Sequence, residues 1–228
     1  LDPKAGGFDF NLGFLIQKEY DPSVFFLPVD FIYLVLLGII IGIFAELYSR
    51  YVLLMQNLGK KWYKNKFVLK MSICGLILGS IYSFLPSTFH NLDELQKIIA
   101  EQNTSIGIAL LAVLVLFITT GLAAASGAPG GLFYPMLTLG GSIGLIMGSW
   151  VEIATGHAPS TYIFAGMGAF VAGCSRTPIT AMFLAFALTK NLLIMKPVLI
   201  SCIASFLVAR AFNEESIYER QIQIELED

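Results

Sequence analysis

The sequence predicts an all-α integral membrane protein, a polytopic bundle of tilted and broken helices. Hydrophobic residues make up 56 % of the 228 residues and charged residues only 13 %. Because soluble domains carry about 25 % charged residues, a soluble globule of this composition would expose large apolar patches. Long apolar segments also follow one another along the chain, and breaks rich in glycine and proline interrupt the later ones.

The charge balance and the chemically reactive residues exclude several other classes. A net charge of −2 gives no electrostatic basis for nucleic-acid binding. Cys74, Cys174 and Cys202 lie far apart in apolar stretches without metal-ligand spacing, so we interpret them as small buried hydrophobic residues. His90 and His157 lie in short polar connections and are predicted to be surface residues. No metal site and no cofactor is therefore expected.

The amino end does not have the pattern of a cleavable signal peptide. It does not begin with Met, and no basic start precedes an apolar run. We predict a loop over residues 1–30, which suggests that the sequence is a piece of a longer chain.

Two apolar segments open the predicted membrane region. Residues 29–58 are almost continuously apolar and long enough to cross the ~30 Å hydrocarbon core with tilt. Residues 67–85 form a second segment, in which Gly75 and Gly79 make a pair of small residues suited to close helix contact. A polar connection follows and contains a short amphipathic helix over residues 92–99.

The remaining segments differ in length. A third span is predicted over residues 105–125, and another apolar helix over 132–151. Two segments, 161–173 and 178–188, hold only about a dozen residues where a full span needs roughly twenty, so half-length helices are expected. Residues 192–212 form the last span. The predicted organisation is a loop at 1–30, a transmembrane region at 31–212, and the start of a final helix with a cytoplasmic acidic tail at 213–228.

The distribution of basic residues orients the chain. The connection between the first two spans is rich in lysine, whereas the next is mainly acidic. The positive-inside rule places the first connection in the cytoplasm and the second outside. The basic group is Arg50, Lys60, Lys61, Lys64, Lys66 and Lys70, and the second connection holds Asp93, Glu94 and Glu101 against Lys97. We expect a multi-pass protein of the cell membrane, plasma or inner.

The glycine-rich break at residues 126–131 is the first candidate site. Irregular backbone at membrane depth persists only inside protein or beside a water-filled path. The helix resumes at Leu132 and Phe133, and its first amide N–H groups have no partner within the helix. Together with the positive end of the helix dipole they form an anion site without a charged side chain, which Gly130 and Gly131 leave accessible. A packing kink is the alternative on physical grounds.

Four ordered motifs resemble the CLC family of chloride channels and proton-coupled chloride antiporters. Residues 127–135, GAPGGLFYP, are similar to the family's G-x-F-x-P element. Residues 165–169, AGMGA, resemble a further motif, and residues 175–180, SRTPIT, resemble its R-x-P-[LI]-T stretch. Ile217-Tyr218 resembles the start of the family's final helix. The resemblance runs from about Phe31 onward and implies about half of a CLC-type transmembrane domain.

The resemblance also implies a function and a site. It implies transport of chloride or a similar small anion, by a channel or a proton-coupled antiporter, with chloride as the transported ligand. The implied anion-binding groups are the backbone amides of Leu132 and Phe133 and the hydroxyl of Tyr218. The supporting glycine break consists of Gly127, Gly130, Gly131 and Pro135. Homodimerisation is implied through the last short helices, with Met182, Leu184, Ile194, Ile200 and Ile203 as candidate contacts.

The sequence departs from the family pattern at several points. Tyr134 is larger than the small residue of some relatives, and Leu188 stands before Thr189 where many relatives have a glutamate. Arg176 is interpreted as structural, satisfying helix-end carbonyls. The family's serine loop (G-S-G-I-P type) and gating-glutamate loop (G-R-E-G-P type) are absent, so we expect them in a missing amino-terminal half and expect no conduction from this piece alone.

Two other functions are weighed. A membrane-embedded scaffold or assembly subunit would make the glycine break a packing device and Tyr218 an interfacial anchor. A membrane enzyme has little support, because no His/Asp/Glu cluster or paired carboxylates lie within the spans. Glu46 and Glu152 are solitary residues near span ends, and both are expected to be solvated.

Overall fold

The computed structural model describes residues 28–62, 67–101, 104–127, 130–156, 160–189 and 192–226, and within these ranges every regular element is a helix. The all-α prediction is therefore confirmed. The α-helices are α1 (Pro28–Trp62), α2 (Phe67–Ser83), α3 (Leu92–Ala100), α4 (Ile106–Ser126), α5 (Phe133–Thr155), α6 (Thr161–Ser175), α7 (Pro178–Thr189), α8 (Met195–Phe212) and α9 (Ile217–Leu226), with 3₁₀ turns η2 (Ser87–Phe89) and η3 (Leu192–Ile194).

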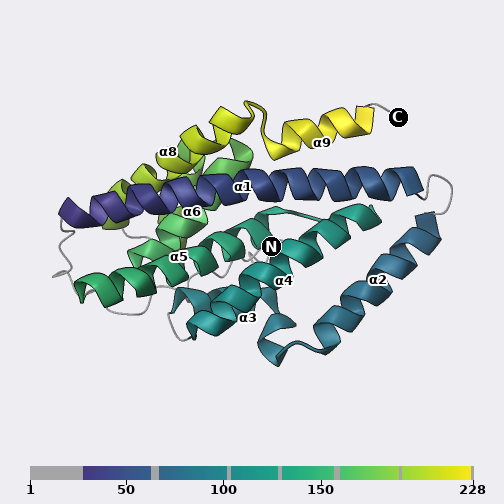
Figure 1. Ribbon diagram of the computed structural model, residues 1–228, viewed down its shortest axis with the longest axis horizontal. Helices are drawn as coiled ribbons and strands as arrows, with labels where there is room; N and C mark the ends of the chain where they lie inside the picture. Colours follow the sequence, from purple (N-terminus) through teal and green to yellow (C-terminus); the bar gives the residue numbers. More distant parts are fainter. Residues whose placement is uncertain are drawn as a thin grey trace, which may run out of the picture.

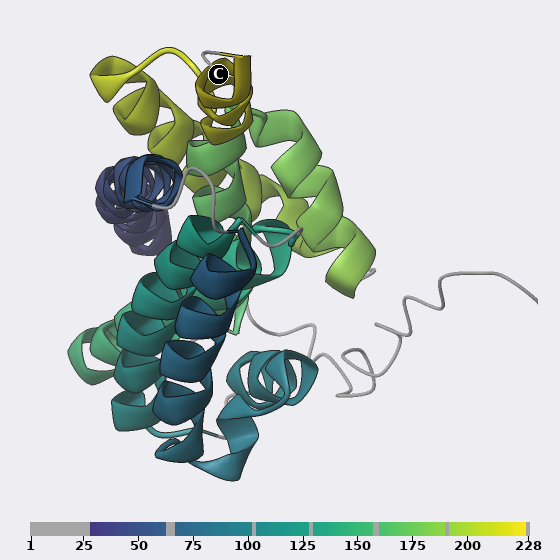
Figure 2. The same cartoon turned by 90° about the vertical axis from the view of Figure 1, so that its right-hand side faces the viewer.

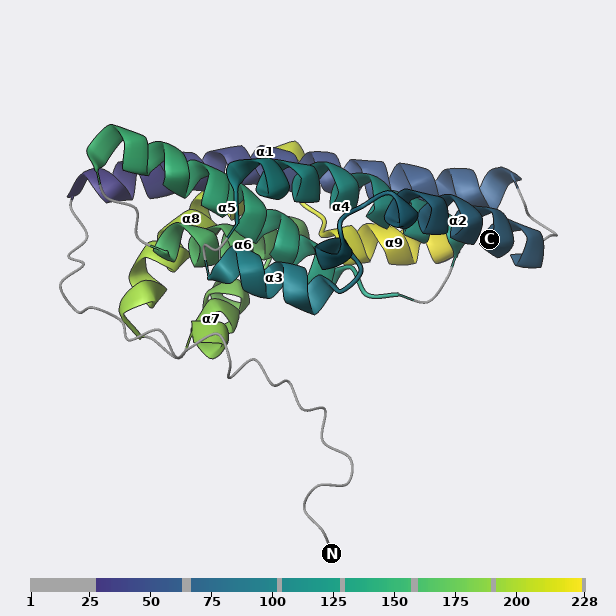
Figure 3. The ribbon, with the colours of Figure 1, turned by 90° about the horizontal axis from the view of Figure 1, so that it is seen from below.

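Helix α1 is the long axis of the bundle (Figure 1). Its 35 residues correspond to about 52 Å at 1.5 Å per residue, so it exceeds the hydrocarbon thickness unless it tilts. Helices α4 and α5 pack along one side of it, and α8 and α9 follow it on the other (Figure 1). Figures 2 and 3 place α3 and α7 on the side of the bundle away from α1.

Four segments of the described chain are long and apolar enough to cross a membrane. They are Asp30–Lys61, Ile106–Ser126, Phe133–Thr155 and Met195–Ile224, the last of which joins α8 to α9. Helices α2, α6 and α7 are apolar but shorter, which agrees with the predicted half-length helices at α6 and α7.

Helix α6 is the centre of the core. Every residue from Thr161 to Cys174 is buried, against α5, α8 and α1. Such close packing requires small residues at the contacts. A Cβ placed on Gly166 would lie 2.9 Å from the Cα of Gly144 on α5, and a Cβ on Gly168 would lie 2.9 Å from the Sγ of Cys202 on α8.

The ends of the half-length helices are defined by the backbone. Helix α6 ends at Ser175, and the C-cap residue Arg176 has a left-handed φ of 61°. Helix α7 begins two residues after this cap, at Pro178. A left-handed residue stops an α-helix, and a proline favours the first turn of the next one. The predicted separation of α6 from α7 is therefore confirmed.

Three smaller expectations meet different outcomes. Cys174 and Cys202 are buried and His90 is exposed, as predicted, whereas Cys74, which was also expected to be buried, is half-buried. His157 lies outside the described residues. Gly75 and Gly79 were expected at a close helix contact, but no described atom lies within 4 Å of a Cβ built at either position. This face of α2 is open.

Candidate functional site

The break between α4 and α5 builds a helix amino-terminus that no side chain caps. Helix α4 ends at Ser126, and the C-cap residue Gly127 has a φ of 72°, a left-handed conformation that glycine adopts without strain. Helix α5 follows Leu132, and no side-chain hydrogen bond caps it there. The first backbone bond at this end runs from the Met136 amide to the Leu132 carbonyl, at 3.1 Å. The amides of Leu132, Phe133 and Tyr134 therefore have no partner within the helix.

A cavity of about 830 Å³ lies next to this break. It is lined by the end of α4, the break, the start of α5, and residues of α1, α2, α3 and α9. Of the predicted site residues, six line it together: Gly127, Gly130, Gly131, Leu132, Pro135 and Tyr218. The chain brings Tyr218 to the cavity from α9, a helix that begins 86 residues after the end of the break.

Phe133 is the predicted site residue that is not among those lining the cavity. Its side chain is half-buried and packs against the hydrophobic core. This position does not prevent a role for its backbone amide, since the expected donor is the N–H group and not the ring. Tyr218 is 40 % exposed, so its ring is accessible at the cavity wall.

The cavity wall is neutral over the described residues. Its polar side chains belong to Gln56, Tyr82, Thr119, Thr120, Tyr218 and Gln221, and none of the described lining residues carries a charge. The hydroxyls of Thr119 and Thr120 donate to the carbonyls of Val115 and Leu116 in their own helix. Amide N–H groups, a phenol hydroxyl and a helix dipole therefore supply the positive potential at this site.

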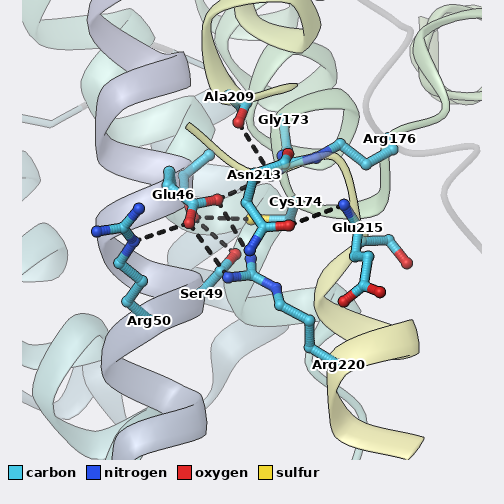
Figure 4. Close-up of polar contacts among 12 residues, drawn as sticks. Glu46, Ser49, Arg50, Gly173, Cys174, Arg176, Ala209, Asn213, Glu215 and Arg220 are labelled. Carbon is cyan, nitrogen blue, oxygen red and sulfur yellow. Dashed lines mark hydrogen bonds and ion pairs between the residues drawn. The ribbon is translucent and has the colours of Figure 1, made fainter. Parts of the chain in front are cut away.

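Sequence analysis missed a cluster of charged side chains that connects α1, the end of α6 and α9. Glu46 was expected to be solvated, and this prediction is wrong: the residue is 3 % exposed. Its carboxylate accepts from Arg50, Arg176 and Arg220 (Figure 4). Only the Arg50 contact, four residues along the same helix, could have been found from local spacing. Glu152 is exposed, as expected.

Arg176 has the structural role predicted for it. Its guanidinium donates to the carbonyls of Gly173, Ala209 and Asn213, which lie at the ends of α6 and α8. The same group also forms a 2.7 Å ion pair with Glu46, so it joins two helix ends to α1.

Two further contacts fix α9 along α1. The side chain of Gln221 donates to that of Gln56 at 3.3 Å, and the Lys60 ammonium donates to the Ile224 carbonyl at 2.9 Å. Since both helices run in the same direction, the contacts follow one another along the pair (Figure 1). These contacts connect α9 to the part of α1 that lines the cavity.

Several known proteins are similar to this chain in sequence. The family model described as "Voltage gated chloride channel" matches residues 8–210. The H(+)/Cl(-) exchange transporter ClcA of Vibrio parahaemolyticus is 30 % identical over 191 residues, which cover 81 % of this chain and 41 % of the transporter. The protein of the same name from Klebsiella pneumoniae subsp. pneumoniae is 31 % identical over 203 residues, covering 86 % and 43 %. The chain thus spans less than half the length of these relatives.

Solved structures share the fold. A slow cyanobacterial Cl⁻/H⁺ antiporter superposes with a TM-score of 0.79 at 24 % identity, over 94 % of this chain and 51 % of the other. A CLC-type fluoride/proton antiporter gives a TM-score of 0.73 at 19 % identity, over 89 % and 49 %. At these identities the comparison supports the arrangement of helices alone.

Proposed function

This chain belongs to the voltage gated chloride channel family, and from that premise we propose that it forms the carboxy-terminal part of a membrane pathway for chloride or a similar small anion. It is a multi-pass integral membrane protein. The complete protein carries out the transport, because an amino-terminal part completes the pathway. Proton movement recorded together with anion flux distinguishes a channel from a proton-coupled exchanger.

One observation carries the proposal: the uncapped amino-terminus of α5 and the Tyr218 side chain meet at one uncharged cavity. A desolvated anion requires several donors at once, and a helix amino-terminus supplies them. We assign the anion contacts to the Leu132 and Phe133 amides and the Tyr218 hydroxyl. Neutral donors suit transport, since an ion held by fixed positive charges would leave slowly.

The test is anion flux through the complete protein in lipid vesicles. Tyr218→Phe removes one neutral hydrogen bond, worth about 0.5–1.5 kcal/mol, so we expect chloride affinity to fall about two- to tenfold. Gly131→Val places a branched side chain beside the cavity and should abolish most of the flux. A Cβ at Gly131 meets no described atom within 4 Å, so the protein should still fold.

Gly75→Val is the matched control, because a Cβ there also meets no described atom and the residue does not line the cavity. Its flux should equal that of the unchanged protein. If Gly131→Val and Tyr218→Phe both keep normal flux and selectivity, the scaffold function replaces transport through this cavity.

We also propose that the complete protein is a homodimer that pairs through α7 and α8. The candidate contacts need revision, because Met182 and Ile194 are buried inside the chain's own core. Ile203 is 42 % exposed and remains available, and Leu184 and Ile200 are half-buried. The same two helices also expose Ile179, Phe183 and Leu207.

A further inference from the structure

The Glu46 cluster joins the ion-pair network to the helix that carries Tyr218. The Glu46 carboxylate lies 2.9 Å from the Nε of Arg50 and 2.7 Å from Arg176. Arg220 contacts both carboxylate oxygens, at 3.1 and 3.2 Å (Figure 4). The side chains of Glu46, Arg176 and Arg220 are at most 11 % exposed, whereas Arg50 is 58 % exposed.

Helix α9 has little apolar packing of its own. Among its described side chains only Ile217 is fully buried, while Ile222 is 56 % and Leu226 80 % exposed. Hydrophobic burial therefore contributes little to the position of this helix. Its polar contacts with α1 remain, and of these the Glu46–Arg220 pair is the one whose two charges are both buried.

The charges of the cluster make the Glu46–Arg220 pair sensitive to the loss of either partner. One carboxylate faces two buried guanidiniums, and arginine stays protonated in proteins. A guanidinium that loses its carboxylate cannot become neutral, so it must reach water or remain buried at high cost. Arg220 lies on α9, and Tyr218 lies two residues before it on the same helix.

We propose that Glu46 and Arg220 are positioning residues of the anion pathway: their ion pair fixes α9 against α1 and so holds the Tyr218 hydroxyl at the cavity. The assignment rests on the proposed function, since it gives Tyr218 its role. Neither residue lines the cavity. They act on the anion through the helix that they anchor.

The first experiment measures the position of α9 without measuring transport. Cysteines replace Gln56 and Gln221, whose side chains are in contact at 3.3 Å, in a complete protein carrying Cys74→Ser. The rate of disulfide formation between the two in this background is the reference for the variants. Arg220→Gln should slow it at least fivefold, and Arg220→Lys should restore part of the rate because it keeps the charge.

Arg50→Gln is the matched control, since Arg50 pairs with the same carboxylate but is exposed and lies on α1 itself. It should leave the disulfide rate unchanged. Glu46→Gln should slow the reaction as Arg220→Gln does, and Arg220→Gln keeps the test valid if the Glu46 variant does not fold. An unchanged rate in Arg220→Gln overturns the proposal.

The second experiment connects the position of α9 to the anion. Chloride dependence of flux is measured for Tyr218→Phe, Arg220→Gln and the double variant, each normalised to folded protein. Arg220→Gln should raise the chloride KM, and Tyr218→Phe should then add less than a twofold further effect. A loss of folded protein alone would leave KM unchanged, and full additivity of the two substitutions also overturns the proposal.

The two proposals fail in different ways. If Tyr218→Phe alone has no effect on flux, the anion contact at Tyr218 is wrong, whatever the disulfide rates. If Tyr218→Phe weakens chloride binding but Arg220→Gln changes neither the disulfide rate nor KM, the anion contact stands and the positioning role of Glu46 and Arg220 is wrong.

Discussion

At the scale of single residues, the buried carboxylate of Glu46 is the feature with the largest energetic consequence. A charge inside a helical bundle is stable only when ion pairs and hydrogen bonds replace its hydration. Glu46 has three such partners, two of them buried. The Arg50 side chain is 58 % exposed, so water screens its pair with Glu46 more than it screens the pairs with Arg176 and Arg220.

The first residue-scale prediction concerns stability. Glu46→Gln removes the buried carboxylate that both Arg176 and Arg220 contact, and removing one member of a buried ion pair costs about 3–5 kcal/mol. We expect the unfolding free energy of the complete protein in detergent to fall by that order. Glu152→Gln is the matched control, because Glu152 is exposed on α5 and its loss should change little. Equal stability of the two variants would contradict this account.

The sequence predicted some site residues but not this cluster. Leu132 and Gly131 were proposed from the local chemistry of the glycine break, and Tyr218 from the resemblance of its motif to the start of the family's final helix. Glu46 has partners 130 and 174 positions away, so nothing in its local sequence distinguishes it from a solvated glutamate. Ion pairs between distant segments depend on tertiary packing, which the local pattern does not contain.

At the scale of helices, glycines at the contacts of α6 determine how closely the bundle packs. Helix association in lipid depends on packing and on hydrogen bonds, since lipid tails are as apolar as the side chains. A Cβ on Gly140 would lie 2.7 Å from the Cβ of Phe170, and its other nearest neighbour is the Gly166 carbonyl. The backbones of α5 and α6 therefore touch, and neither can move aside without losing contacts elsewhere.

The element-scale prediction follows from this contact. Gly166→Ala adds a methyl group against the backbone of α5, and overpacking of a closed core costs about 1–3 kcal/mol. The unfolding free energy of the complete protein should fall by that amount. Gly75→Ala is the matched control on the open face of α2, where the added methyl meets no described atom and alanine is the better helix former. A loss of stability in both variants would show that the α5–α6 contact is not the cause.

Helix lengths were predictable because they depend on local apolar length and on breaks. The predicted spans at 105–125 and 192–212 correspond to α4 and to η3 with α8, with ends that differ by at most one residue. Which helices touch was less predictable. The small pair Gly75 and Gly79 in α2 has the same spacing as real contact sites elsewhere, yet no described residue covers it.

At the scale of the whole molecule, the described part leaves broad apolar surfaces uncovered. Helix α2 exposes Val68 and Leu76 beside its open glycines, and α4 exposes Leu110 and Leu114. Lipid or further protein surface is compatible with such faces, whereas water is not. The exposed faces therefore agree with a multi-pass protein embedded in lipid.

The face formed by α7 and α8 gives the whole-molecule prediction. Ile179 and Phe183 are four residues apart on α7, as are Ile203 and Leu207 on α8, so each pair lies on one side of its helix. All four are more than 40 % exposed, and α7 and α8 pack against each other. A second copy would bury these side chains.

Tryptophan at positions 203 and 207 tests this pairing. A tryptophan facing lipid is tolerated, but two of them in a closely packed interface would overlap with the partner copy. The complete protein with Ile203→Trp and Leu207→Trp should therefore be a monomer by light scattering in detergent and should keep its anion flux, because neither position lines the cavity. Leu114→Trp on α4 is the matched control and should leave the dimer intact. A dimer that persists in the double variant would show that the interface lies on another face. Monomers with normal flux would show that each copy holds a complete pathway of its own.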